Sequence, residues 1–175
     1  MDSVSTISSQ DLFYSEDKFD NLFSPQSKVL SSRHWTPLSV ARKAAKFLAS
    51  HSGAKVLDIG SGVGKFCLAA GHMHQNVNWF GIEQRTHLVA EAKAAKRKLG
   101  LDNVTFITGN FTQLNISGFD NFYFFNSFYE NLYGHEVIDD SVEVSSQLYH
   151  YYNNYLYRQF AAMPSGCRVA SFHSL

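Results

Sequence analysis

The sequence predicts an α/β fold in which a parallel β-sheet is sandwiched by helices. From residue 54 onward, short apolar runs alternate with segments of helical periodicity. The first run, "VLDI", leads directly into the glycine-rich turn "GSGVG". The run "FDNFYFFNSF" is almost wholly apolar, which is typical of a strand covered on both faces. Strands that alternate with helices form parallel sheets through right-handed crossovers, so this order of elements predicts the fold.

A length of 175 residues fits one domain. Residues 1–32 are expected to form a polar tail and one or two short helices, ahead of a domain over residues 33–175. The domain begins with a helix for which Thr36 is the expected N-cap and Pro37 the first residue. The expected apolar stripe of this helix consists of Val40, Ala44, Phe47 and Leu48.

The remaining strands and helices alternate along the chain, except that the third and fourth strands have no predicted helix between them. The predicted strands lie at residues 54–60, 76–83, 103–110, 119–128 and 166–175. The predicted helices lie at residues 65–74, 86–100 and about 141–162. The last helix is rich in tyrosines, which at helical spacing are expected to pack on the sheet, although exposed tyrosines can also stack on bases.

Composition and charge narrow the range of functions that the protein could have. Lys plus Arg and Asp plus Glu both number 15, and this balance argues against a nucleic-acid partner. The isolated Cys67 and Cys167, a polar N-terminus and the absence of an apolar run long enough for a bilayer predict a cytoplasmic protein without a membrane span. His72 and His74 do not face one site on a helix, so no metal site is expected.

The glycine-rich turn excludes two common ligand classes by its spacing. A dinucleotide site needs G-x-G-x-x-G, but Lys65 takes the place of the third glycine. A P-loop needs G-x-x-x-x-G-K-[ST], but Phe66 follows Lys65 and Ile59 stands at the first glycine position. The turn instead has an acidic residue, Asp58, followed by a glycine at every second place.

This pattern resembles motif I of the class I, Rossmann-like, S-adenosylmethionine-dependent methyltransferases. The resemblance implies that S-adenosyl-L-methionine is the cofactor and that the turn wraps its methionine part. The turn residues that it implicates are Asp58, Gly60, Ser61, Gly62 and Gly64. A structural glycine-rich turn in another α/β fold is the alternative reading.

Residues at later strand ends agree with this resemblance. It implies that Glu83, with Gln84 beside it, binds the ribose hydroxyls, and that Asn110 and Phe111 contact the adenine. Upstream, "RHWTP" is similar to a segment that lies over the methionine end, so Trp35 and Thr36 are cofactor candidates. A helix cap and a core tryptophan explain these last two residues equally well.

The segment "FFNSFYEN" resembles motif IV, which lines the methyl-transfer pocket of the family. The resemblance makes Asn126, Phe128 and Tyr129 the candidates for the catalytic mouth, and Asn126 a further cofactor contact. Ser127 stands where amine methyltransferases have a proline. Asn126 can also be read as a plain strand-end cap.

The resemblance implies a sheet of seven strands whose C-terminal β-hairpin is missing from this sequence, so the domain is expected to be C-terminally incomplete or a minimal member of the family. A second copy of the chain or a partner could then cover the exposed fifth strand. "LDIGSGVG" and "RQFAAMPSGCRVAS" also resemble, more loosely, the non-SET histone-lysine methyltransferases.

The sequence thus predicts methyl transfer by in-line displacement to an unidentified acceptor, a small molecule or a protein lysine or other amine. The alternative is a non-catalytic cofactor-binding module within a complex.

Overall fold

Five parallel strands form a single sheet. The computed structural model describes residues 9–125, 127–132 and 137–172. The strands are β1 (Lys55–Ile59), β2 (Asn78–Glu83), β3 (Val104–Thr108), β4 (Asn121–Phe125) and β5 (Arg168–Phe172). They lie in the order β3-β2-β1-β4-β5, and every neighbouring pair is parallel. The expected strands and the α/β fold class are confirmed.

The strand order reverses between β1 and β4, and this reversal determines where a ligand can bind. β2 and β3 extend the sheet on one side of β1, whereas β4 and β5 extend it on the other. The connections after β1 and β4 therefore leave toward opposite faces, and a crevice remains at the carboxyl ends of these two strands. The glycine-rich turn follows β1, so it lies at this crevice.

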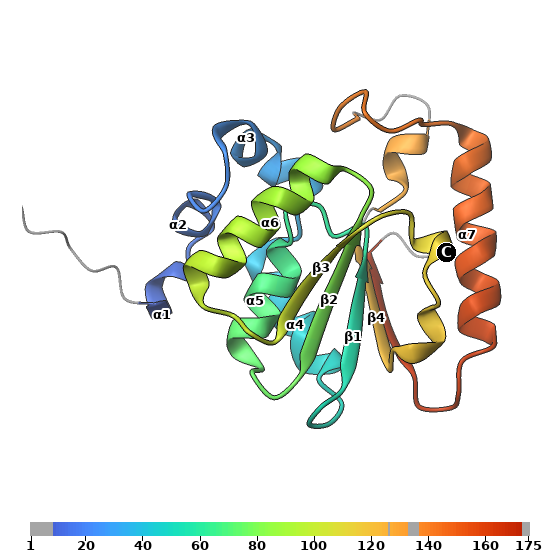
Figure 1. The fold of residues 1–175 in the computed structure, drawn as a ribbon, viewed down its shortest axis with the longest axis horizontal. Coiled ribbons are helices and arrows are strands. Elements are labelled where there is room, and N and C mark those ends of the chain that lie inside the picture. Colours follow the sequence, from blue (N-terminus) through green and yellow to red (C-terminus); the bar gives the residue numbers. More distant parts are fainter. Residues whose placement is uncertain (1–8, 126, 133–136, 173–175) are drawn as a thin grey trace, which may run out of the picture.

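Three helices cover one face of the sheet, as Figure 1 shows. They are α4 (Leu38–Leu48), α5 (Lys65–Met73) and α6 (Thr86–Leu99). Their buried side chains share one apolar cluster with Val56, Trp79 and Val104 of the strands. Gly100, in the left-handed conformation, ends α6 directly after its basic last turn.

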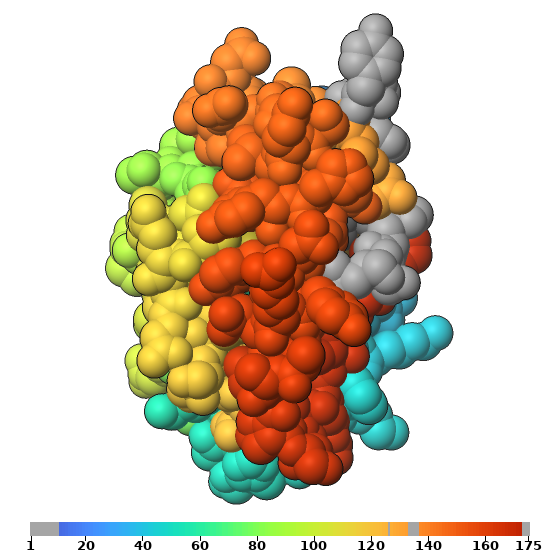
Figure 2. Space-filling view, turned by 90° about the vertical axis from the view of Figure 1, so that its right-hand side faces the viewer, coloured from blue at the N-terminus to red at the C-terminus, as the bar shows by residue number. Residues whose placement is uncertain are grey.

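The opposite face is covered by the long helix α7 (Ser146–Ala161) and by two 3₁₀ turns, Phe111–Gln113 and Ile116–Gly118. Leu57, Phe122 and Phe124 of the sheet pack there with Leu156 in a second cluster. In Figure 2 the orange-to-red α7 runs down this face beside the yellow turns. Among the tyrosines of α7, Tyr152 is buried on the sheet as expected, whereas Tyr151 and Tyr157 are exposed. Among the described residues, none of the helices combines the length and the apolar character needed to cross a bilayer.

The N-terminal segment contains three helices, where one or two were expected. These are α1 (Ser9–Leu12), α2 (Glu16–Asp20) and α3 (Pro25–His34). Phe13, Phe19 and Phe23 are buried in the same cluster as α4, α5 and α6. The segment therefore contributes to the core of the domain.

Helix α4 differs from the expectation at its start and along its apolar face. Its N-cap is Pro37, and the Thr36 hydroxyl instead bonds the Tyr123 hydroxyl at 3.0 Å. Phe47 is half exposed, and the buried face consists of Leu38, Ala41, Ala44, Ala45 and Leu48. The stripe is rotated because small alanines allow α4 to approach α5 and the sheet closely.

A buried lysine joins the N-terminal helices to the first turn of α5. Lys65 Nζ lies 2.7 Å from Asp20 and 2.6 Å from Glu16, and it donates to Ser31 at 2.9 Å. Lys65 and Asp20 are both buried. Removing one partner of a buried ion pair leaves the other charge unpaired in a medium of low dielectric constant.

We therefore expect Lys65→Ala to lower the free energy of unfolding by about 3–5 kcal/mol, as is typical when a buried pair is broken. Urea denaturation measures this change. Lys43→Ala, at an exposed position of α4, is the matched control and should change stability little. Equal effects of the two substitutions would show that the Lys65 pair contributes nothing specific.

Candidate functional site

The turn between β1 and α5 depends on glycine at three positions. Gly60, Gly62 and Gly64 all have positive φ, at 73°, 53° and 78°. The backbone N–H groups of Gly60 and Ser61 donate to the Ile82 carbonyl of β2, at 2.9 and 3.0 Å. Residues with a Cβ rarely adopt these φ values, so the glycine spacing follows directly from the shape of the turn.

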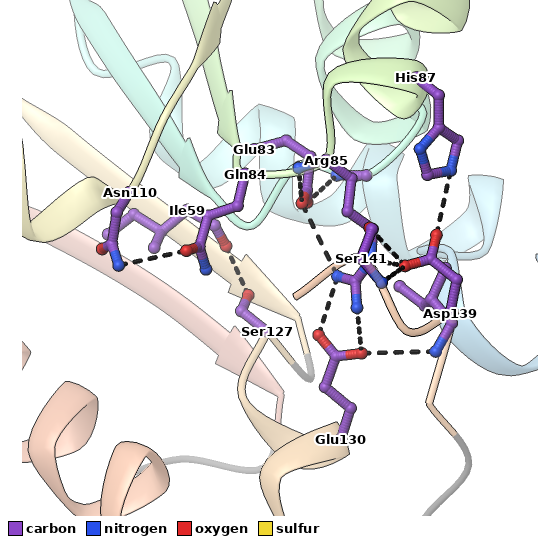
Figure 3. Close-up of polar contacts among 12 residues, drawn as sticks. Ile59, Glu83, Gln84, Arg85, His87, Asn110, Ser127, Glu130, Asp139 and Ser141 are labelled. Carbon is purple, nitrogen blue, oxygen red and sulfur yellow. Dashed lines mark hydrogen bonds and ion pairs between the residues drawn. The ribbon is translucent and has the colours of Figure 1, made fainter. Parts of the chain in front are cut away.

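Neighbouring side chains also approach all three of these glycines closely, and a Cβ on Gly64 would collide with the ring of Phe106. A Cβ on Gly62 would lie 2.5 Å from a ring carbon of Trp35, and one on Gly60 would lie 2.8 Å from the Cβ of Ser127. Ser127 Oγ donates to the Ile59 carbonyl, which links the end of β1 to the segment after β4 (Figure 3). The serine that departs from the family pattern thus has a defined structural partner.

A cavity of about 360 Å³ opens at this edge of the sheet. The predicted site residues that line it are Trp35, Gly60, Gly62, Glu83, Gln84, Phe111, Phe128 and Tyr129. A smaller adjoining cavity of about 20 Å³ brings in Thr36, Asp58 and Ser61. Gly64 and Asn110 are not among the lining residues, and Asn126 lies outside the described residues.

Glu83 ends β2 with its carboxylate buried at the cavity. One oxygen accepts from the Gly62 N–H at 3.1 Å and the other from the Arg85 N–H at 3.0 Å. Burial raises the pKa of this carboxyl above its usual range, while the two backbone donors and the Arg85 charge oppose the shift. Glu83 therefore lies at the carboxyl edge of the sheet, as the sequence predicts.

Trp35 and Thr36 are both buried, and both have partners within the protein. Trp35 Nε1 donates to the Ser27 carbonyl at 2.8 Å, and its ring forms part of the cavity wall. The Thr36 hydroxyl pairs with Tyr123. Trp35 is therefore both a core residue and part of the cavity wall.

Asn110 has its side chain engaged in this structure. Its oxygen accepts from the N–H and the hydroxyl of Thr112, while its amide donates to Gln84 at 3.2 Å and Tyr152 at 3.0 Å. Phe111 is buried and forms part of the cavity wall. A further bond to the Asn110 oxygen would require one Thr112 donor to be exchanged.

Sequence reasoning missed the arginine at the centre of the cluster in Figure 3. Arg85 is buried and bonds Glu130 through two parallel contacts of 2.9 and 2.8 Å, and Asp139 at 3.0 Å. Both carboxylates belong to a wall formed by Tyr129–Leu132 and Val137–Val142. We call it the acceptor-side wall, because the resemblance to motif IV implies that a methyl acceptor binds there. The available signal was an arginine two residues after a strand-end glutamate, followed by an acidic segment.

The buried Asp58 has few partners for its charge. Cys67 Sγ approaches its carboxylate at 3.7 Å. Burial raises its pKa to about 8, the contact with the Cys67 thiol lowers it, and the nearby Glu83 charge raises it further. Among the described residues, no group of three or more His, Cys, Asp and Glu side chains is placed to hold a metal ion.

The Asp58 shift predicts how stability depends on pH. Between about pH 4 and 8 the folded protein keeps a proton on Asp58 that the unfolded chain has lost, so stability falls as pH rises. We expect the stability of wild type relative to Asp58→Asn to fall by up to about 1.4 kcal/mol per pH unit from pH 5 to 7. Urea denaturation at each pH measures this. Asp102→Asn, at an exposed carboxylate, is the control, and parallel curves for wild type and Asp58→Asn would refute the shift.

Curated relatives match parts of the chain. A tRNA (guanine-N(7)-)-methyltransferase of Microcystis aeruginosa is 44% identical over 54 residues, which cover 31% of the chain and 26% of that protein. One from Synechocystis is 34% identical over 93 residues, covering 48% and 43%. The chain thus matches from about a quarter to less than half of the length of these relatives.

Solved structures show the same fold. A methyltransferase of Geobacter sulfurreducens in complex with S-adenosyl-L-homocysteine has a TM-score of 0.55 at 20% identity, covering 86% of the chain and 55% of that protein. An RNA methyltransferase of Salinibacter ruber with the same ligand has a TM-score of 0.50 at 25% identity, covering 55% and 63%. The family model described as "Methyltransferase domain" matches residues 50–149, which include the glycine turn, Glu83 and most of the residues that line the cavity. The chain therefore belongs to the methyltransferase domain family.

Proposed function

We propose that the chain transfers a methyl group from S-adenosyl-L-methionine to an amine acceptor by direct displacement. The observation that carries this proposal is the cavity of about 360 Å³ that joins the positive-φ glycine turn, the buried Glu83 carboxylate and an aromatic wall. A cavity of this size suits a small cofactor. The chain's membership of the methyltransferase domain family supports methyl transfer as the reaction.

Two buried groups fit the cofactor in particular. The Asp58 carboxylate adjoins the small cavity with a raised pKa, and the ammonium group of the cofactor's methionine part would relieve that shift. Ser61 Oγ is buried beside it without a hydrogen-bond partner among the described residues, so it has a donor and acceptor to offer. A turn without phosphate-binding spacing and with carboxylates on both sides suits a cofactor that carries positive charge.

The candidate residues then divide by the part of the cofactor that they would hold. Glu83 and Gln84 are proposed for the ribose, and Asn110 and Phe111 for the adenine. The methionine part is assigned to the turn and the segment before α4, with Trp35, Thr36, Asp58, Gly60, Ser61, Gly62 and Gly64. Asn126, Phe128 and Tyr129 are proposed to face the acceptor.

The proposed chemistry needs orientation more than acid–base groups. S-adenosyl-L-methionine supplies a methyl group already activated by a positively charged sulfur. Phe111, Phe128 and Tyr152 form an aromatic wall, with centroids of neighbouring rings 5.2–5.3 Å apart, that would exclude water and restrict the approach of the acceptor. An amine acceptor would lose its proton to solvent before it attacks.

The names of the curated relatives and the charge of this chain favour different methyl acceptors. The curated relatives are tRNA methyltransferases by name, which makes RNA the competing acceptor. Yet residues 99–157, which include the acceptor-side wall and most of α7, contain no Lys or Arg. The acidic residues in the same stretch are Asp102, Asp120, Glu130, Glu136, Asp139, Asp140 and Glu143. Binding of a nucleic acid rests on Lys and Arg contacts to phosphates, so this stretch favours a cationic amine.

Cofactor binding is tested at the glycine turn. We expect calorimetry to detect S-adenosyl-L-homocysteine binding to wild type, and Gly60→Ala to weaken it at least tenfold, because the new Cβ meets Ser127. Gly53→Ala is the matched control, since its φ is also positive, at 80°, but its Cβ would have open space. Unchanged affinity in Gly60→Ala, or binding of NAD instead, would contradict the proposal.

The acceptor class is tested with isotopically labelled S-adenosyl-L-methionine. We expect label to enter a lysine-rich peptide or a small diamine, and none to enter bulk tRNA. The two amines distinguish a protein side chain from a free molecule. Label in tRNA would replace the amine proposal, and cofactor binding without transfer to any of the three would favour the non-catalytic module.

A further inference from the structure

Arg85 occupies a position that touches both halves of the cavity. It follows β2 directly, as the N-cap residue of α6, and it forms part of the cavity wall. Its backbone N–H donates to the Glu83 carboxylate, which is on the proposed cofactor side. Its guanidinium lies between Glu83, whose oxygen is 3.9 Å from Nη1, and Glu130 and Asp139 of the acceptor-side wall, as Figure 3 shows.

Every nitrogen of the guanidinium has a carboxylate partner. Nη1 and Nη2 donate to the two oxygens of Glu130, and Nε donates to Asp139. The Arg85 side chain is 3% exposed and that of Glu130 13%, so their charge-assisted bonds are largely shielded from water, whereas Asp139 is 31% exposed. The planar fork of arginine matches such a two-oxygen contact, whereas the single ammonium group of lysine does not.

The two carboxylates in turn organise the wall itself. Glu130 also accepts the Ile138 N–H at 3.4 Å, across the stretch that separates the two parts of the wall. Asp139 accepts the N–H of Ser141 at 2.9 Å and pairs with His87 at 3.2 Å. Both parts of the acceptor-side wall line the cavity, through residues that include Tyr129, Ile138 and Val142.

The charges make this arrangement depend on the arginine. Glu83, Glu130 and Asp139 all lie close to one guanidinium. Without the guanidinium fork, Glu130 and Asp139 would lose the donor that they share, and their charges would repel each other and Glu83. The wall would then move away from β2, and the cavity would open on its acceptor side.

We infer that Arg85 is a positioning residue that holds the acceptor-side wall against the cofactor end of the cavity. One residue thereby couples the orientation of the Glu83 carboxylate to the closure of the pocket in which the methyl group would be transferred. The part of this inference that concerns the wall stands on the ion pairs alone, and the part that concerns the cofactor rests on the proposed function.

Hydrogen exchange and ligand dissociation test the inference together. In Arg85→Lys we expect amide exchange in Tyr129–Leu132 and Val137–Val142 to accelerate at least tenfold, while exchange in β1 and β4 stays slow. Dissociation of S-adenosyl-L-homocysteine, measured by stopped flow, should become at least fivefold faster. Glu130→Gln should reproduce both effects from the other side of the pair, and the double variant should add little to either one.

Arg97→Lys is the matched control, because it makes the same change at an exposed position of the same helix. Exchange and dissociation at wild-type rates in both Arg85→Lys and Glu130→Gln would overturn the inference. Acceleration spread evenly over the sheet would also overturn it, since that result reports a loss of global stability. If wild type fails to bind S-adenosyl-L-homocysteine, the proposed function fails, and exchange in the ligand-free protein still decides the role of Arg85.

Discussion

The organisation of this site depends on a buried carboxylate that needs donors on both of its sides. Glu83 receives the Gly62 N–H from the turn after β1 and the Arg85 N–H from the start of α6. An unpaired carboxylate at this depth would be costly, so the turn and the helix start must both face it. Gly62 does so with a positive φ, and the Arg85 guanidinium lies 3.9 Å from the same carboxylate. The shape of the cavity thus follows from satisfying one group.

The second constraint is topological. Because β1 and β4 are neighbours whose connections leave in opposite directions, their carboxyl ends face a common crevice. Small residues make this closeness possible, since Gly60 lies against Ser127 and the Ser127 hydroxyl bonds the end of β1. A departure from the family motif at Ser127 therefore has a local physical reason, independent of what the acceptor is.

Acidic and basic residues are unevenly distributed along the chain, and this distribution bears on the acceptor that we propose. The wall on the acceptor side is acidic and is held by a single buried arginine, whereas most Lys and Arg residues precede residue 99. Negatively charged surroundings suit a positively charged cofactor and the ammonium product of amine methylation, because positive charge passes from sulfur to nitrogen during transfer. The same surroundings disfavour a polyanion, which is why charge and the names of the relatives lead to different acceptors.

Local signals in the sequence were sufficient for the order of the strands and helices, the glycine turn and Glu83, because periodicity, strand ends and positive φ leave marks within a few residues. They were not sufficient for the rotated face of α4, since close packing selected Leu38 and Ala41 over the larger Phe47. They also could not predict that Lys65 pairs with Asp20, or that Arg85 pairs with Glu130 and Asp139. The partners in each pair lie 45 to 54 residues apart along the chain. The sequence by itself determined the five strands, the helices that connect most of them and the position of the glycine turn. Only the tertiary structure decided which charges meet, because a pairing of buried charges depends on distance in space and not on spacing along the chain.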